Sequence, residues 1–139
     1  MSPVNVLIID DEPDVAAYQE RVVSDHGWRV RVAASGDQGL ALALEETPDV
    51  ILLDLMMPGG RGGLSTFLEL RRNPELESVP VVFVTAYPEP DPGDQQSFLG
   101  RQERHRPAAY VEKPVDPDTL LAVLEEVTSV RDLAPSERS

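Results

Sequence analysis

The stretch VNVLIIDDE, residues 4–12, is an apolar run that ends abruptly in three acidic side chains. A run of this length is short for a buried helix and typical of a strand that is covered on both faces. Pro13 follows directly, and proline is well accommodated in the first turn of a helix. The stretch therefore predicts a buried strand, then a turn that displays carboxylates, and then a helix.

Apolar runs and helical patterns alternate along the rest of the chain. The predicted strands are residues 4–9, 28–33, 50–53, 79–84 and 108–112, and the predicted helices are residues 13–26, 35–46, 64–72 and 116–130. Short strands that alternate with helices favour a parallel sheet with helices on both faces, which is an α/β fold. We expect a single domain over residues 1–130, followed by a flexible tail over residues 131–139.

The order of the strands does not follow from this pattern. The flavodoxin-like order 2-1-3-4-5 is one of two common solutions, and it places strands 1 and 3 side by side where the order reverses. Ligands of open α/β sheets bind at that point, beyond the carboxyl ends of the strands. In this order Asp10 and Asp11, after the first strand, would converge with Asp54, after the third.

The residues at these strand ends form a chemically complementary set. Three carboxylates in one place repel each other, and Mg²⁺, a hard cation that takes oxygen ligands, would offset the repulsion. Thr85 follows the fourth predicted strand with a hydroxyl group, and Lys113 follows the fifth with a positive charge. Together these groups suit an incoming phosphoryl group, because cations neutralise its oxygens while a carboxylate attacks. Each residue alone is common at caps and turns, so the hypothesis depends on the combination.

With these motifs the chain resembles the receiver domains of two-component response regulators. The resemblance rests on four segments, DDEP at residues 10–13, DLMMP at 54–58, VTA at 84–86 and YVEKP at 110–114. It covers about residues 4–130 and implies a single-domain, flavodoxin-like (βα)5 sandwich with a five-stranded parallel sheet in the order 2-1-3-4-5.

The resemblance implies a phosphorylation site and a metal site. Asp54 would be the phosphoacceptor. Asp10 and Asp11 would bind Mg²⁺, Asp11 more directly, and Asp54 and the backbone carbonyl of Met56 would complete the protein ligands. The phosphoryl group would come from a sensor histidine kinase or a histidine phosphotransfer protein.

The resemblance also implies a conformational switch. Thr85 would hydrogen-bond the phosphoryl group and Lys113 would pair with it, while Tyr110 would move inward as Thr85 is drawn to the phosphate. The Lys113–Pro114 peptide bond would be cis. On this interpretation the protein is a signalling receiver and no enzyme beyond its own phosphorylation and slow self-dephosphorylation. It would act on a downstream protein target that the sequence does not identify.

The segment between Thr85 and Lys113 departs from the family pattern. Lys113 follows Thr85 by 28 positions, which is longer than usual, and three alternating prolines open the segment. Because prolines cannot continue a helix, we expect the fourth helix to be remodelled or displaced, over about residues 93–104. The local basic cluster there is either a solvated loop or a partner surface.

Two further features of the sequence bear on the site. Four of residues 59–63 are glycine, which predicts unusual mobility beside the metal site. Met56 and Tyr87 occupy the positions that tune phosphoryl lifetime in the family. Because methionine cannot position a water by a strong hydrogen bond, we expect slow hydrolysis of the phosphoaspartate.

Composition excludes several other classes of function. The formal net charge of −13 opposes binding to nucleic acid and to anionic membranes. The sequence has no cysteine, which excludes disulfides, thiolate metal sites and cysteine nucleophiles. No apolar stretch approaches transmembrane length, and no basic region precedes the first apolar run. We expect a cytoplasmic protein without direct nucleic-acid binding or membrane insertion.

Three alternatives stay open. The first is a fragment of a larger regulator or hybrid kinase, which a longer reading frame would reveal. The second is a Mg²⁺-dependent phosphatase that forms an aspartyl phosphate. That chemistry needs its nucleophile and acid together after the first strand, whereas the isolated nucleophile here is Asp54. The third is a pseudo-receiver that switches without phosphate, and the complete set of site residues argues against it.

Overall fold

The computed structural model describes residues 4–55, 63–86 and 107–138, with side chains described as far as residue 129. Predictions that concern Met56, Tyr87, the glycines of residues 59–62 and the fourth helix lie outside the described residues.

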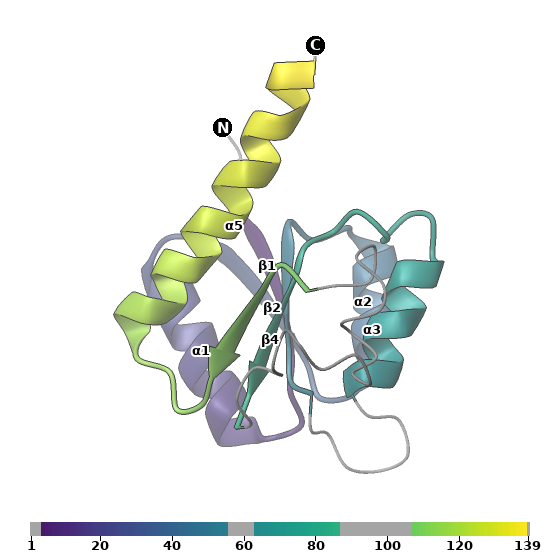
Figure 1. The fold of residues 1–139 in the computed structure, drawn as a ribbon. Coiled ribbons are helices and arrows are strands. Elements are labelled where there is room, and N and C mark those ends of the chain that lie inside the picture. The colour runs from purple at the N-terminus through teal and green to yellow at the C-terminus, as the bar shows by residue number, and fades with distance from the viewer. Residues whose placement is uncertain (1–3, 56–62, 87–106, 139) are drawn as a thin grey trace, which may run out of the picture.

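Strands and helices alternate through the described part of the chain. The strands are β1 (Asn5–Ile9), β2 (Arg29–Ala33), β3 (Val50–Leu53), β4 (Val81–Thr85) and β5 (Ala109–Glu112), and the helices are α1 (Pro13–Asp25), α2 (Gly36–Glu45), α3 (Gly63–Arg72) and α5 (Pro117–Arg138). All strand pairs are parallel, and the sheet has the order β2-β1-β3-β4-β5 (Figure 1). The predicted fold class and strand order are confirmed.

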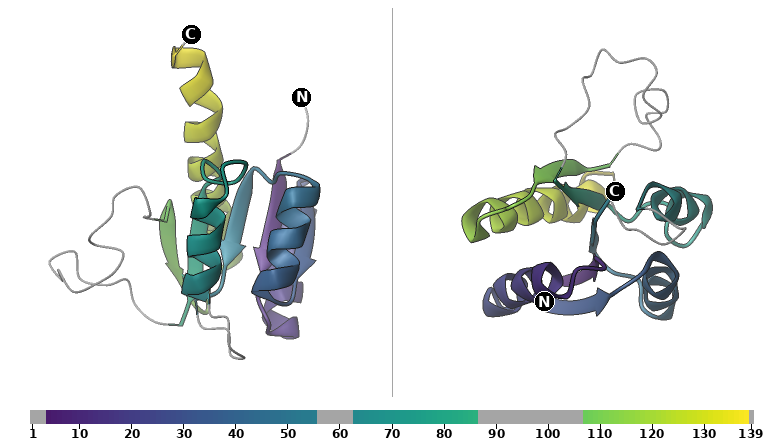
Figure 2. Two further views of the ribbon diagram at one scale, coloured as in Figure 1. Left: turned by 90° about the vertical axis from the view of Figure 1, so that its right-hand side faces the viewer. Right: turned by 90° about the horizontal axis from the view of Figure 1, so that it is seen from below.

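The sheet separates two helical layers. Helices α1 and α5 cover one face, and α2 and α3 cover the other (Figure 2). Side chains alternate between the faces along a strand, so Leu7 and Ile9 join the core under α2 and α3, whereas Val6 and Ile8 join the core under α1 and α5. Every residue of β1, β3 and β4 is buried, which explains why these strands are continuous apolar runs.

Local signals in the sequence set the helix starts. Pro13 opens α1, and Gly27, with a φ of 93°, follows its end in the left-handed region that favours glycine. The Ser35 hydroxyl accepts a hydrogen bond of 3.2 Å from the N–H of Gln38 and caps α2. These signals were legible in the sequence, and each helix begins within one residue of its predicted start.

Two predicted boundaries were wrong by more than one residue. The predicted fourth strand began at residue 79, but β4 begins after Pro80, which has no N–H for the ladder, and Thr85 is its last residue instead of following it. The last helix was predicted to end at residue 130, but α5 continues to Arg138 and projects beyond the sheet (Figure 2). Arg131, Leu133 and Ala134 have high helix propensity, but Asp132 and Pro135 have low propensity, so propensity does not explain this extension. The division into a domain and a flexible tail stays a prediction.

No helix in the described ranges combines the length and the apolar character that crossing a membrane requires.

Candidate functional site

Backbone hydrogen bonds hold two aspartates at the carboxyl edge of the sheet. The N–H of Asp10 donates to the carbonyl of Ala33, and the N–H of Asp54 donates to the carbonyl of Ile9, both at 3.0 Å. Each aspartate thus extends the ladder of its strand by one residue. Because β1 and β3 are neighbours with Ile9 opposite Leu53, the two side chains leave the sheet at the same place. Both are almost fully buried, with 3% of each residue exposed.

Lys113 reaches the same place from the end of β5. Its N–H donates to the carbonyl of Thr85 at 2.7 Å, and its peptide bond to Pro114 is cis, as predicted. The Nζ atom lies 3.1 Å from Oδ2 of Asp10 and 3.4 Å from Oδ2 of Asp54. Only 13% of the Lys113 side chain is exposed, so solvent screens these ion pairs less than it screens pairs on the surface.

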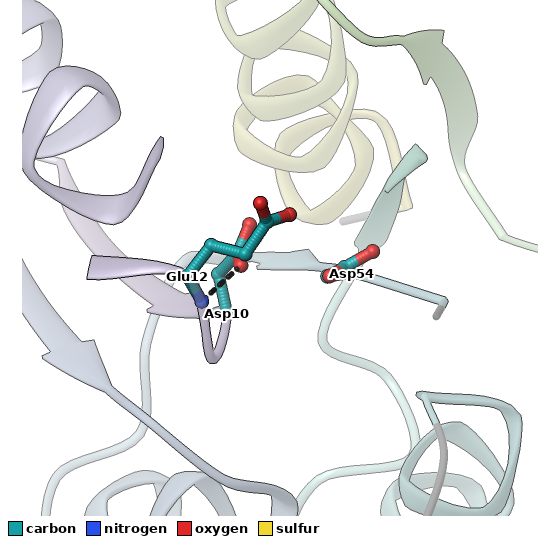
Figure 3. Close-up of side chains that lie close together, drawn as sticks. All are labelled: Asp10, Glu12 and Asp54. Atoms are coloured by element: carbon teal, nitrogen blue, oxygen red, sulfur yellow. Dashed lines mark hydrogen bonds between the residues drawn. The ribbon is translucent and has the colours of Figure 1, made fainter. Parts of the chain in front are cut away.

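A third carboxylate, which sequence reasoning missed, also contacts this lysine. Oε1 of Glu12 lies 3.2 Å from Nζ of Lys113, and the N–H of Glu12 donates to Oδ1 of Asp10 at 2.9 Å. Carboxylate oxygens of Asp10, Glu12 and Asp54 lie within 4.8 Å of one another (Figure 3). Glu12 is visible in the sequence as the third acidic residue of the run 10–12. Its contact with Lys113 could not be predicted, because it depends on the path of the turn before α1.

Asp11 lies beside this group, although it is not one of the three residues whose oxygens gather most closely. Its Oδ1 is buried and finds no hydrogen-bond partner among the described residues. A buried acceptor without a donor is costly, and a hard cation would satisfy it. The carboxylates that gather closely enough to hold a cation with oxygen ligands are those of Asp10, Glu12 and Asp54, and the predicted role of Asp11 as a ligand stays a prediction.

Burial and the neighbouring charges change the proton affinity of the site. Burial raises the pKa of Asp10, and the charge of Asp54 adds to this, although hydrogen bonds from the Glu12 N–H and from Lys113 oppose it. Burial alone would lower the pKa of Lys113, but its hydrogen bond to Asp10 and the charges of Asp10 and Asp54 outweigh burial and raise it. The lysine of the site therefore stays charged, and a further positive charge would stabilise the buried carboxylates.

Thr85 and Tyr110 lie on the flank of the site. Thr85, with 1% exposed, ends β4 two residues after Phe83, so both side chains leave the same face of the sheet. Tyr110 is half-buried in β5 opposite Phe83, and their rings meet edge-on with centroids 5.3 Å apart. The structure thus places the two residues that were predicted to form a switch on adjacent strands.

Sequence comparisons place the chain beside signalling proteins. The family model described as the response regulator receiver domain matches residues 6–125. The protein PilH of Pseudomonas aeruginosa is 35% identical over 122 residues, which cover 88% of this chain and 95% of PilH. A probable cyclic di-GMP phosphodiesterase of Vibrio cholerae is 30% identical over 115 residues, 83% of this chain but only 24% of that protein. The matched region thus occurs alone or as part of longer chains.

Solved structures agree with these matches. The chemotaxis response regulator CheY4 of Vibrio cholerae superposes with a TM-score of 0.77 at 27% identity, over 91% of this chain and 99% of that one. A CheY-like response regulator receiver domain protein from Methanospirillum hungatei has a TM-score of 0.79 at 22% identity, over 94% and 98% of the two chains, and supports the fold alone.

Proposed function

Because the chain belongs to the response regulator receiver domain family, we propose that its Asp54 accepts a phosphoryl group in a two-component pathway. The observation that carries the proposal is the convergence of Asp10, Asp54 and Lys113 from three strand ends, with both carboxylates buried. Such an arrangement suits phosphoryl transfer, which depends mainly on positioning and on neutralising charge. Receiver domains are signalling domains, so the modification itself is the output of this chemistry.

The chemistry follows from the positions of the side chains. An ionised oxygen of Asp54 attacks the phosphorus of a phosphohistidine on a sensor histidine kinase or a histidine phosphotransfer protein. The new P–O bond forms as the P–N bond breaks, and the histidine, protonated on its other ring nitrogen, leaves as neutral imidazole. Lys113 is close enough to Asp54 to bond one phosphoryl oxygen, and no general base is needed because the attacking carboxylate carries no proton.

The side chains that would hold Mg²⁺ are Asp10, Asp11 and Asp54. When bound, the ion would neutralise carboxylate and phosphoryl oxygens. Two observations support this assignment: the Oδ1 of Asp11 has no hydrogen-bond partner within the part of the chain that the structure describes, and burial raises the pKa of Asp10. The further ligand expected from the backbone carbonyl of Met56 lies outside the described residues and stays a prediction.

The switch would work through Thr85 and Tyr110. A phosphoryl group can shift a conformational equilibrium only by binding one state better than the other. Thr85 supplies a hydroxyl at the end of β4, and the ring of Tyr110 packs against Phe83 of the same strand. Movement of Thr85 toward the phosphoryl group would change the space open to Tyr110. The altered surface would then meet a downstream protein in the cytoplasm.

Acetyl phosphate tests the proposal directly. With Mg²⁺, the wild-type protein should gain the mass of one phosphoryl group, and the Asp54→Asn variant should gain none. Asp14→Asn removes an exposed carboxylate of α1 and is the matched control, which should be labelled as fully as the wild type. Labelling of Asp54→Asn, or no labelling of the wild type, would contradict the proposal. Repeated turnover of a phosphoester would instead support the phosphatase alternative.

A further inference from the structure

Glu12 differs from the other two carboxylates that contact Lys113. Asp10 and Asp54 expose 2% and 3% of their side chains, whereas Glu12 exposes 59%. Its side chain extends from the turn after β1 toward the side on which Asp54 lies (Figure 3). The contact joins residues 101 positions apart. Glu12 thus holds the ammonium group from the solvent side of the site.

We propose that Glu12 is a positioning residue that holds Lys113 in the metal-free, unphosphorylated protein and competes with the phosphoryl group for its ammonium. The inference rests on the proposed function, since it concerns the lysine that would pair with the phosphoryl group. Glu12 also belongs to the group of three carboxylates that lie close enough to hold a cation, and the inference gives it a separate role toward Lys113.

The argument starts from the donors of the ammonium group. Lysine has three N–H donors, and three carboxylates lie within 3.4 Å of Nζ of Lys113. Asp10 and Glu12 accept hydrogen bonds from this ammonium and Asp54 forms an ion pair with it, so a phosphoryl group on Asp54 competes for the ammonium with the two carboxylates that already hold its donors. Glu12 is the partner that leaves at least cost, because water can solvate its exposed carboxylate, whereas Asp10 and Asp54 are buried.

Removing the charge of Glu12 should have opposite effects on two ligands. In Glu12→Gln, Lys113 is released and one repulsive charge is lost, so the anion beryllofluoride should bind about threefold to fivefold more tightly at saturating Mg²⁺. Mg²⁺ alone should bind more weakly by a similar factor, because the site has lost negative charge. If Glu12 only supported the fold, Glu12→Gln would bind both beryllofluoride and Mg²⁺ more weakly than the wild type.

Glu12→Asp separates the contact from the charge. This variant keeps the carboxylate but withdraws it from Lys113 by one methylene group. Beryllofluoride affinity should rise as in Glu12→Gln, whereas Mg²⁺ affinity should stay near the wild-type value. Asp14→Asn, which removes an exposed acidic charge two residues along the chain, should change neither affinity. Calorimetry with each ligand measures these constants.

Lys113 is the only lysine of the sequence, which gives a second readout without any ligand. Selective ¹³C and ¹⁵N labelling of lysine yields one side-chain signal in the NMR spectrum. In the metal-free protein this signal should shift in Glu12→Gln and Glu12→Asp but stay in place in Asp14→Asn.

The outcomes distinguish this inference from the proposed function. If the wild type binds beryllofluoride but Glu12→Gln binds it no more tightly, or if the lysine signal does not move, the inference is overturned. If the wild type binds no beryllofluoride at all, the proposed function fails, and the lysine signal still decides whether Glu12 holds Lys113.

Discussion

The ammonium group of Lys113 lies 3.1 Å from a carboxylate oxygen of Asp10, although the two residues are 103 positions apart in the sequence. The contact joins the end of β1 to the end of β5 across the carboxyl edge of the sheet. It therefore depends on the correct assembly of the whole sheet, and it compensates a carboxylate that is otherwise almost enclosed by protein.

Lys113→Met should destabilise the metal-free protein. The variant keeps most of the side-chain volume but leaves Asp10 and Asp54 buried without their cation. Breaking a buried ion pair is costly, and we expect a loss of about 2 to 3 kcal/mol in the free energy of unfolding. Urea denaturation in the presence of a chelator measures this loss.

Mg²⁺ provides the internal control for that variant. The ion would replace the missing positive charge, so it should stabilise Lys113→Met more than it stabilises the wild type. Arg72→Met removes an exposed cation at the end of α3 and should change the free energy of unfolding little, with or without Mg²⁺. Equal unfolding energies for Lys113→Met and the wild type under chelation would refute the role assigned to the ion pairs.

The sequence predicted the elements of this fold better than their contacts. Apolar runs and helix-start signals such as Ser35 act locally, so they can be read without knowing the tertiary structure. Strand order depends on which strands pair, and no local signal carries that information, so the order came from the family resemblance. The end of α5 was missed because the amphipathic pattern stops near residue 130 and Pro135 argues against a helix, although the helix continues to Arg138.

Within the site, the identities of the residues were easier to predict than the side chains that each of them contacts. Asp10, Asp54 and Lys113 stand at strand ends, where an open α/β sheet gathers its ligands. Glu12 was passed over because its role depends on the path of the turn toward a lysine that is distant in sequence. The contacts of Arg71 could not be predicted from the sequence either, because they depend on how the chain returns to β4.

Arg71→Ala should destabilise the fold far from the site. The guanidinium group donates three hydrogen bonds of 2.5 to 3.1 Å to carbonyl oxygens in the segment before β4, those of Leu76, Glu77 and Val79. It also lies over the ring of Phe67, 5.1 Å from the centroid. The carbonyl of Leu76 keeps the N–H of Val79 as a donor, and the contact to Glu77 is exposed, so the main loss in the variant is the donor to the partly buried carbonyl of Val79 and the contact with Phe67. We expect a loss of about 1 to 3 kcal/mol in the free energy of unfolding.

The neighbouring arginine supplies the control for Arg71. Arg72→Ala removes the same charge from an exposed position and should change the free energy of unfolding little. Arg71→Lys should recover only a part of the loss, because one ammonium cannot reproduce the planar fork of donors. Urea denaturation of the three variants tests the assignment, and similar losses for Arg71→Ala and Arg72→Ala would contradict it.

Acid should remove a stabilising cap at the start of α5. The side-chain hydrogen bond from the hydroxyl of Thr119, at 2.7 Å, and that from its N–H, at 3.0 Å, lower the pKa of Asp116 below the usual 3.8. A lowered pKa in the folded state means stability that is present above 3.8 and lost as the pH falls through the folded value. Asp116→Ala should therefore be less stable than the wild type at neutral pH.

The difference between Asp116→Ala and the wild type should shrink as the pH falls below 3.8, because the wild-type cap is then protonated. Urea midpoints measured across that range give the pH dependence of the difference. Asp118→Ala, an exposed change in the same turn, leaves the cap in place and is the matched variant for comparison at neutral pH. A difference between Asp116→Ala and the wild type that does not vary with pH would rule out the capping role.

Gly63→Ala should disturb the phosphoacceptor more than the fold. Gly63 opens α3 directly against the chain that follows β3, and its N–H donates to the carbonyl of Leu55 at 3.1 Å. A Cβ atom at this position would collide with the backbone carbonyl of Asp54 and would lie 2.6 Å from Cα of Leu55. Since backbone cannot move aside as a flexible side chain can, either the backbone at Asp54 or the start of α3 must shift.

We expect Gly63→Ala to lose about 1 to 3 kcal/mol of stability and to slow labelling by acetyl phosphate about tenfold or more. Gly39→Ala is the matched control, because its new Cβ would press on the side chain of Ile9, which can adjust more easily. It should lose stability but keep most of the labelling rate. The comparison is made where both variants are folded, by mass spectrometry over time. If the two variants were slowed equally, overpacking in general would explain the effect, and the close contact between Gly63 and Asp54 would have no special role.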